Sequence, residues 1–157
     1  MARELKKDKV ARAAEIEKVL FDYYGAGACS LDYTDPFSLT CAVVLSAQCT
    51  DVAVNKVTPT LFGTFPTPQA LASATVEEVE GIIKQLGFYH AKARNLVALA
   101  QKVCSDFGGE IPADIELLQT LPGVGRKTAN CVMCEAFHDP QGIAVDTHVY
   151  RIAHRLK

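Results

Sequence analysis

The sequence predicts an all-α fold, and three observations support this prediction. Apolar residues recur every three or four positions through most of residues 10 to 107, as on one face of a helix. Helix-start residues precede these stretches and glycines follow them. No stretch of useful length alternates apolar and polar residues as a half-buried strand does. With 157 residues, 49% of them hydrophobic, the chain can bury one substantial core and has room for a smaller lobe.

The first predicted helix is amphipathic, and the second is buried. The first carries an apolar stripe and ends at Gly25 and Gly27; the stripe consists of Val10, Ala13, Ile16, Leu20 and Tyr23. Asp35 followed by Pro36 is typical of a helix cap and a first-turn proline. The helix after them is apolar on every side over residues 39–45. A helix of this kind is expected at the centre of the core.

The middle of the chain predicts shorter helices. Asp51 is expected to cap one helix, and Pro59 to end or kink it because proline lacks the amide that helix interiors require. Residues 65–68, with two prolines, predict a loop that leads into a short helix. Thr75 and Glu78 have the spacing of a capping box, in which each side chain accepts from the other's backbone amide. A further helix is therefore expected to begin at residue 75 or 76.

A long helix precedes the most distinctive part of the sequence. Gly87 is expected to close the helix that the capping box opens. A strong apolar stripe follows and stops at Gly108 and Gly109; it consists of Ala93, Leu96, Val97, Ala100, Val103 and Phe107. After Pro112, the apolar residues around 115–118 predict the first helix of a helix-hairpin-helix that extends over about residues 114–137.

The turn of this hairpin has the sequence Leu-Pro-Gly-Val-Gly at residues 121–125. Gly123 and Gly125 bracket Val124, and glycine allows both positive φ angles and close approach of a ligand to bare amides. The second helix opens at Gly125, so its free N–H groups and the positive end of its dipole favour an anion such as a phosphate. Lys127 lies in its first turn, where this field favours the neutral, nucleophilic amine.

A carboxylate follows at a fixed interval. Asp146 lies 19 residues after Lys127, in the string Val-Asp-Thr-His, and is expected to be the N-cap of another helix. The strings LPGVGRKTAN and IAVDTHVYR, together with LSAQCTDVAVNKVTP upstream, closely resemble the endonuclease III family of DNA glycosylases. The resemblance covers about residues 10 to 155.

The resemblance implies a helix-hairpin-helix DNA glycosylase fold. A six-helix domain is expected over residues 29–139, with a partial second lobe formed by residues 1–28 and 140–157. Full-length members of the family carry a [4Fe–4S] cluster on a four-cysteine motif near the C-terminus, and no such spacing occurs in this sequence. No stop signal follows the helix expected from Thr147. We therefore expect that the chain is less stable and less active than a version with a further C-terminal region.

The resemblance also implies a reaction in base-excision repair. A bifunctional glycosylase for oxidised pyrimidines flips the damaged nucleotide out of duplex DNA. Lys127 then attacks the sugar C1′ to form a Schiff base, and β-elimination cleaves the strand. Asp146 stabilises the cationic sugar and assists proton transfer. Two alternatives stay open: a glycosylase of other specificity, such as one for oxidised guanine, and a non-catalytic helix-hairpin-helix module that only binds DNA.

Further DNA-binding residues follow from the same resemblance. Gln48 matches the residue that enters the space left by the flipped base, although it could simply end a helix. Phe88 lies where the family often has a wedge between bases; a core position is the alternative. Lys92 is a candidate phosphate contact or a solvated lysine. The hairpin residues Gly123, Val124, Gly125 and Arg126 complete the predicted interface. His148 either orients Asp146 or packs on the second lobe.

Composition bounds the partners. The net charge is −2 and the pI about 6.1, so a DNA-binding face must be a local patch; the candidates are Lys56, Lys84, Lys92, Arg94, Arg126 and Lys127. The charged N-terminus and the lack of a long apolar segment predict a cytoplasmic protein with no membrane partner, and a monomer is expected.

Six cysteines occur in the sequence, and two of them form a Cys-x-x-Cys pattern. Cys131 and Cys134 lie in a predicted helix without a second ligand pair, so two small core residues are favoured over a zinc or redox site. No metal site is predicted in this chain. Cys49 is not a candidate nucleophile, because no histidine lies near it in sequence.

Overall fold

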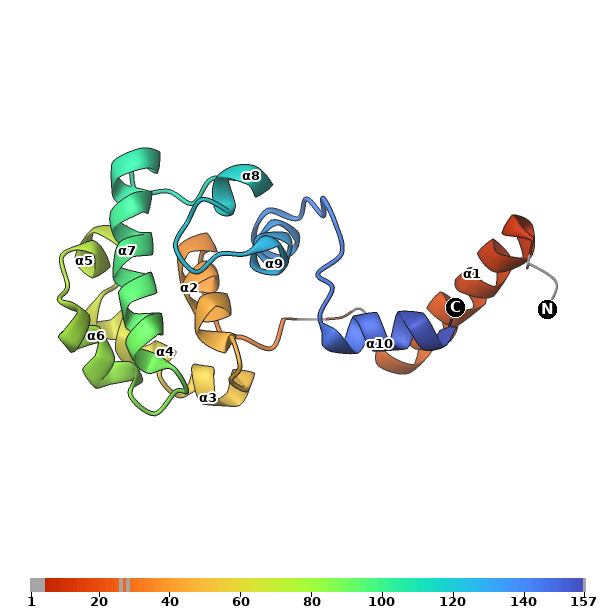
Figure 1. Cartoon of the computed structure of the whole chain (residues 1–157), viewed down its shortest axis with the longest axis horizontal. Helices are drawn as coiled ribbons and strands as arrows, with labels where there is room; N and C mark the ends of the chain where they lie inside the picture. The colour runs from red at the N-terminus through yellow and green to blue at the C-terminus, as the bar shows by residue number, and fades with distance from the viewer. Residues whose placement is uncertain (1–4, 26, 28, 157) are drawn as a thin grey trace.

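The computed structural model describes residues 5–25, 27 and 29–156, and all regular structure in these residues is α-helical (Figure 1). This confirms the all-α prediction. In chain order the helices are α1 (Lys6–Tyr24), α2 (Pro36–Ser46), α3 (Asp51–Asn55), α4 (Thr58–Thr64), α5 (Pro68–Ala72), α6 (Val76–Ile83), α7 (Tyr89–Phe107), α8 (Ile115–Leu118), α9 (Arg126–Phe137) and α10 (Thr147–Leu156). Residues 29–139 contain eight helical segments, α2 to α9, of which α3, α5 and α8 have only four or five residues.

Helix α2 forms the centre of the core, as its uniformly apolar sequence predicts. It lies between α7 and α9 and contacts both (Figure 1). Leu39, Cys41, Ala42 and Leu45 are fully buried and lie on different sides of the helix. Helices α5 and α6 pack against α7 on the side away from α9. One continuous hydrophobic core thus joins α2 through α9.

Two of the predicted helix starts are confirmed in detail. Asp35 accepts hydrogen bonds from the amides of Phe37 and Ser38, and Pro36 occupies the first turn of α2. At the start of α6, the amide of Thr75 donates to Glu78, and the amide of Glu78 donates to the hydroxyl of Thr75. These caps satisfy amides that would otherwise lack partners at the two helix ends.

Three expected boundaries are wrong by a few residues. Thr50, rather than Asp51, caps α3, because its hydroxyl accepts from the amide of Ala53. The carboxylate of Asp51 instead accepts a hydrogen bond from Ser30. Pro59 does not end α3, which already stops at residue 55, but lies in the first turn of α4. Helix α6 ends at residue 83 rather than at Gly87.

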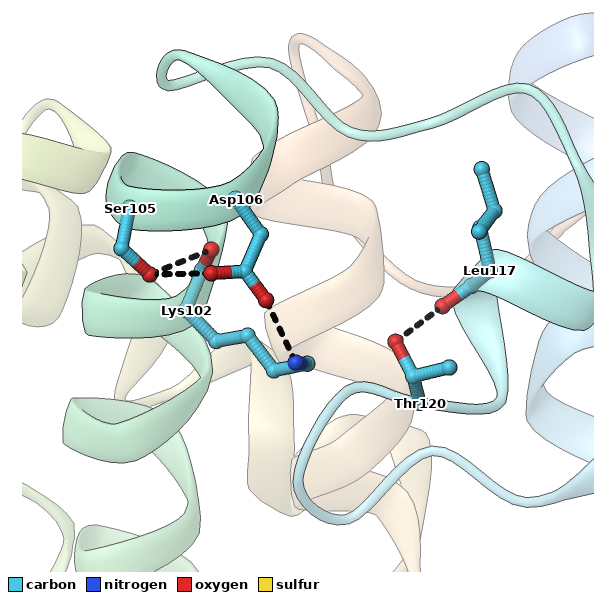
Figure 2. A network of polar contacts seen from close by, with 5 residues as sticks. All are labelled: Lys102, Ser105, Asp106, Leu117 and Thr120. Atoms are coloured by element: carbon cyan, nitrogen blue, oxygen red, sulfur yellow. Dashed lines mark hydrogen bonds and ion pairs between the residues drawn. The ribbon is translucent and has the colours of Figure 1, made fainter.

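The long helix α7 ends at Gly108, as predicted, where φ is +65°. Its last turn carries an ion pair between Lys102 and Asp106, and Asp106 also accepts from the hydroxyl of Ser105 (Figure 2). Beside it, the hydroxyl of Thr120 donates to the carbonyl oxygen of Leu117 at 2.7 Å and closes the turn after α8 (Figure 2).

Helices α1 and α10 lie together, apart from the core (Figure 1). Arg12 in α1 donates to the carbonyl oxygen of Leu156 in α10 at 2.6 Å. Neither helix has a buried residue. Ala13, Ile16 and Leu20 of the predicted stripe line an open groove of about 600 Å³ together with Leu156. Within the described residues, no helix is long and apolar enough to cross a membrane.

Candidate active site

The hairpin turn between α8 and α9 is closely packed. Gly123 has a φ of +79°, and a Cβ atom there would lie 3.1 Å from the side-chain nitrogen of Asn95 and 3.1 Å from Cγ1 of Val44. Any larger residue would be strained by its backbone and crowded by its neighbours. Val124 is only 6% exposed, and its amide donates to the carbonyl oxygen of Leu121 at 3.0 Å. Val124 therefore anchors the turn in the core, which does not fit the DNA contact predicted for it.

The N-terminus of α9 differs from most others in the chain. Side chains cap α2, α3, α5, α6 and α8, whereas α9 begins at Gly125 without a side-chain cap. Gly125, Arg126 and Lys127 are all exposed. The first amides of this helix therefore lack an acceptor from a capping side chain, and the helix dipole adds a positive field. This end can bind an anion through its backbone groups.

Lys127 lines a cavity of about 730 Å³. Three segments that are distant in the sequence form it: the turn after α2, the first turn of α9, and the start of α10. Its lining residues are Gln48, Cys49, Lys127, Val145, Asp146, Thr147, His148 and Tyr150. The structure thus brings together Gln48, Lys127 and Asp146 from the residues that the sequence singles out.

Asp146 is the N-cap of α10, as predicted. Its carboxylate accepts from the amide of Val149 at 2.7 Å. This hydrogen bond is the main reason why the pKa of Asp146 lies below its ordinary value; burial opposes it, and the amide of His148 and the charge of Lys127 lower the pKa further. The carboxylate is therefore anionic at neutral pH while it faces the same cavity as Lys127.

Asn130 links the helix that carries Lys127 to the loop that carries Asp146. It lies one turn after Lys127 and is buried, and its side-chain amide donates to the carbonyl oxygen of Ile143 at 3.4 Å. The loop passes so closely that a Cβ atom on Gly142 would lie 3.0 Å from Oδ1 of Asn130. No motif in the sequence marks Asn130 as a site residue, although its spacing of three from Lys127 places it on the same side of α9.

Gln48 and Phe88 share an unusual backbone conformation. Their φ angles are +56° and +58°, in the left-handed region that non-glycine residues seldom adopt. Both side chains are exposed, and Phe88 is 69% exposed. The two turns are neighbours, because a Cβ atom on Gly87 would lie 3.9 Å from Sγ of Cys49. Strained residues of this kind cluster at binding sites, and the exposure of Phe88 favours the predicted wedge over a core position.

Lys92 is buried, whereas a lysine that binds phosphate needs an accessible amine. Its side chain is only 5% exposed, and its amine donates to the thiol of Cys49 at 3.0 Å. A phosphate contact would require this side chain to leave Cys49. The sequence-based assignment of Lys92 to the DNA-binding surface therefore does not fit its location. Arg126, in contrast, is exposed at the first position of α9.

The cysteine pair in α9 does not lie in the core, contrary to the interpretation favoured from the sequence. Cys134 is exposed and Cys131 half-buried, because the core side of α9 is formed by Ala129, Val132 and Met133. Burial, followed by nearby charges, raises the pKa of the Cys131 thiol to about 11. Within the described residues, no three His, Cys, Asp or Glu side chains converge as metal ligands. The six cysteines therefore do not fit a [4Fe–4S] cluster.

Tyr150 is a further cavity residue that the sequence analysis missed. It is exposed, lines the cavity, and lies with its ring 4.2 Å from that of His154. Its spacing of four from Asp146 is the available sequence signal, because residues four apart share one side of a helix. His148 also lines the cavity, and its ring nitrogen lies 3.1 Å from a guanidinium nitrogen of Arg151.

A glycine turn that opens an uncapped helix, with a lysine and an anionic carboxylate at one cavity, is the arrangement expected of a helix-hairpin-helix base-excision protein. The model of the HhH-GPD superfamily base excision DNA repair proteins matches residues 41–157. The chain is 48% identical to endonuclease III of Synechocystis sp. over 148 residues, which cover 94% of this chain and 68% of the relative. It is 47% identical to endonuclease III of Bacillus subtilis over 86% of this chain and 61% of the relative.

A solved structure of an endonuclease III–DNA complex also resembles this chain. A trapped endonuclease III–DNA covalent intermediate superposes with a TM-score of 0.85 at 43% identity, over 96% of this chain and 68% of that one. The chain belongs to the endonuclease III family of DNA repair enzymes, within the HhH-GPD superfamily. It spans about 61% to 68% of the length of these relatives.

Proposed function

We propose that this chain is a bifunctional DNA N-glycosylase that removes oxidised pyrimidines from duplex DNA and cleaves the resulting abasic site. One observation carries the proposal: Lys127 and Asp146 face the same cavity at the uncapped N-terminus of α9. Attack on a sugar in DNA requires a nucleophile and an anionic group next to a helix end that binds phosphate. We expect the protein to act as a monomer in the cytoplasm.

DNA binding is proposed to depend mainly on backbone groups. The amides at the start of α9 hold a phosphate, and Arg126 adds a charge beside them. This fits a chain whose net charge is −2, because no global positive field is needed. Phe88 stacks in the duplex, and Gln48 enters the space that the flipped nucleotide leaves. The exposed, strained turns at both residues support these roles.

The proposed chemistry assigns unequal roles to Lys127 and Asp146. The neutral amine of Lys127 bonds to C1′ while the glycosidic bond breaks and the departing base takes up a proton. Asp146 stabilises the positive charge that develops on the sugar. Transfer of the remaining amine proton to the ring oxygen O4′ breaks the C1′–O4′ bond, opens the sugar ring and gives the Schiff base. Removal of a proton from C2′ then expels the 3′-phosphate and cuts the strand.

Borohydride trapping tests the proposal. The chain is incubated with duplex DNA that contains an abasic site, and borohydride reduces any Schiff base to a stable protein–DNA adduct. We expect an adduct with the natural chain and none with Lys127→Gln. Lys7→Gln serves as a control, because Lys7 is an exposed lysine in α1, outside the candidate DNA-binding residues. An adduct with Lys127→Gln would place the nucleophile elsewhere.

A comparison of DNA substrates separates the alternative functions. Duplexes with an oxidised pyrimidine and with oxidised guanine are compared side by side, and faster release of the pyrimidine supports the proposed specificity. Faster release of oxidised guanine would identify the chain as a glycosylase of the alternative specificity. DNA binding without any adduct would identify it as a non-catalytic helix-hairpin-helix module. The solved relative described as a covalent DNA intermediate favours the catalytic outcome.

A further inference from the structure

Cys49 and Lys92 form a side-chain pair at the edge of the candidate cavity that the proposed reaction does not use. Cys49 lies in the turn after α2, is half-buried and lines the cavity. Lys92 lies in the first turn of α7, 43 residues further along the chain, and its amine contacts the Cys49 sulfur at 3.0 Å. The contact joins the turn of Gln48 to the helix that follows Phe88.

The surroundings of the Lys92 amine are unusual for a lysine. The residue is only 5% exposed, and buried lysines are normally paired with carboxylates. Within the described part of the chain, the amine forms no ion pair with a carboxylate, and its hydrogen bond goes to the thiol. A buried nitrogen nucleophile is thus held directly against a sulfur that can be oxidised.

We propose that Cys49 and Lys92 form a reversible covalent link when a hydroperoxide reaches the cavity. Hydrogen peroxide first oxidises the thiol to a sulfenic acid, R–SH + H₂O₂ → R–SOH + H₂O. The Lys92 nitrogen then attacks the sulfur, the S–O bond breaks, and the oxygen leaves as water with one of the amine protons. The product is a sulfenamide with one S–N bond, by the condensation that sulfenic acids undergo with nearby nitrogens.

Proximity favours this product over further oxidation. The amine already contacts the sulfur, so bond formation needs little movement and no diffusion of a second thiol. The cavity gives peroxide access to Cys49, whereas Cys41 is fully buried in the core. The link would tie the turn that carries Gln48 to α7. Its formation requires neither DNA nor catalysis, so it is independent of the proposed function.

Peptide mapping of the peroxide-treated chain tests the link. After blocking of remaining thiols and digestion, we expect a pair of peptides joined through Cys49 and Lys92, lighter than their sum by about 2 Da. Dithiothreitol should separate the pair. Lys92→Arg keeps a long basic side chain but supplies no reactive amine, so it should lose the link. Cys134→Ser changes an exposed cysteine outside the cavity and should keep it.

A disulfide has the same mass change, so the site of the link decides the outcome. Cys49 joined to another cysteine, or oxidised to the sulfinic acid to the same extent in the natural chain and in Lys92→Arg, would overturn the proposal. Cys49→Ser is the second variant and should also lack the link, with nearly the same side-chain volume. Circular dichroism on both variants verifies that the fold is intact, so that loss of the link is due to the missing group.

Discussion

Asn130 donates a hydrogen bond to the carbonyl oxygen of Ile143, and through this contact the helix of Lys127 holds the loop of Asp146. Asn130 is buried one turn after Lys127, and Ile143 lies three residues before Asp146. The close approach of Gly142 to the same side chain leaves the loop little freedom. The relative position of the two proposed catalytic groups therefore depends on a residue that faces the core.

Replacement of Asn130 with alanine is expected to lower catalysis more than DNA binding. The loop loses its attachment to α9, so Asp146 is held less firmly near Lys127; misplacement by about 1 Å can cost on the order of 10² in rate. Single-turnover base release measures this effect, together with the Kd for damaged duplex. Cys134→Ser, at an exposed position further along the same helix, should change neither. Equal losses in rate and affinity for Asn130→Ala would contradict a positioning role.

Asp146→Asn should slow base release by on the order of 10²–10³ while damaged DNA still binds. Asparagine can still cap α10, so the fold is preserved, but the sugar cation loses its counter-charge. The measurement is the single-turnover rate beside a binding titration. Asp139→Asn removes a charge from an exposed residue upstream in the same loop and should leave the rate unchanged. If Asp146→Asn instead lost binding, the aspartate would be only a helix cap.

Phe88→Gly is expected to raise stability and weaken DNA binding. Glycine removes the strain of a left-handed residue, which costs about 1–2 kcal/mol for other side chains, although its own flexibility offsets part of the gain. The stacking surface of the exposed ring is lost at the same time. Urea unfolding and a DNA titration measure the two effects.

His138→Gly provides the matched control for Phe88. His138 has a φ of +53° at the end of α9 and does not line the cavity. The same relief of strain is expected there, with unchanged DNA affinity. An equal loss of affinity in both variants would mean that Phe88 contributes no specific contact.

Gly123→Ala and Gly81→Ala should have opposite effects on stability. At Gly123 a methyl group meets Asn95 and Val44 at 3.1 Å in a backbone of positive φ, so we expect a loss above about 1 kcal/mol. Gly81 lies inside α6 with open space around it, so alanine should add about 0.5–1 kcal/mol. Denaturant midpoints measure both. Similar midpoints for the two variants would contradict the packing described for the hairpin turn.

The cap at Asp35 predicts a loss of stability in acid. Burial raises the pKa of this carboxyl, but hydrogen bonds from Ser38, Thr34 and Phe37 together bring it below its ordinary value of 3.8. The folded pKa is thus lower than the unfolded one, so the stabilisation is present above about 3.8 and is lost as the pH falls through the folded pKa. Asp35→Asn retains an acceptor but does not titrate there, so unfolding curves should show a weaker acid dependence for this variant.

The sequence by itself determined the features that depend on nearby residues. The Asp35 cap, the Thr75–Glu78 box and the stop at Gly108 are formed by groups within a few positions of each other, so their residue types predict them. The same holds for Asp146 as a cap and for Lys127 in the first turn of α9. Where two adjacent residues can both cap, as at Thr50 and Asp51, the local signal does not discriminate, and a contact with Ser30 decides.

Only the tertiary structure decided which side chains face the solvent and which face one another. Val124 and Lys92 were expected at the DNA surface, but both are buried, because contacts between elements distant in the sequence set the orientation of the hairpin and of α7. The pairing of Lys92 with Cys49 spans 43 residues. The contact of Asn130 with the loop of Asp146 requires a buried side-chain amide within hydrogen-bonding distance of that loop. Periodicity assigns residues to a side of a helix, whereas the packing of that side against another element depends on long-range contacts that no local pattern records.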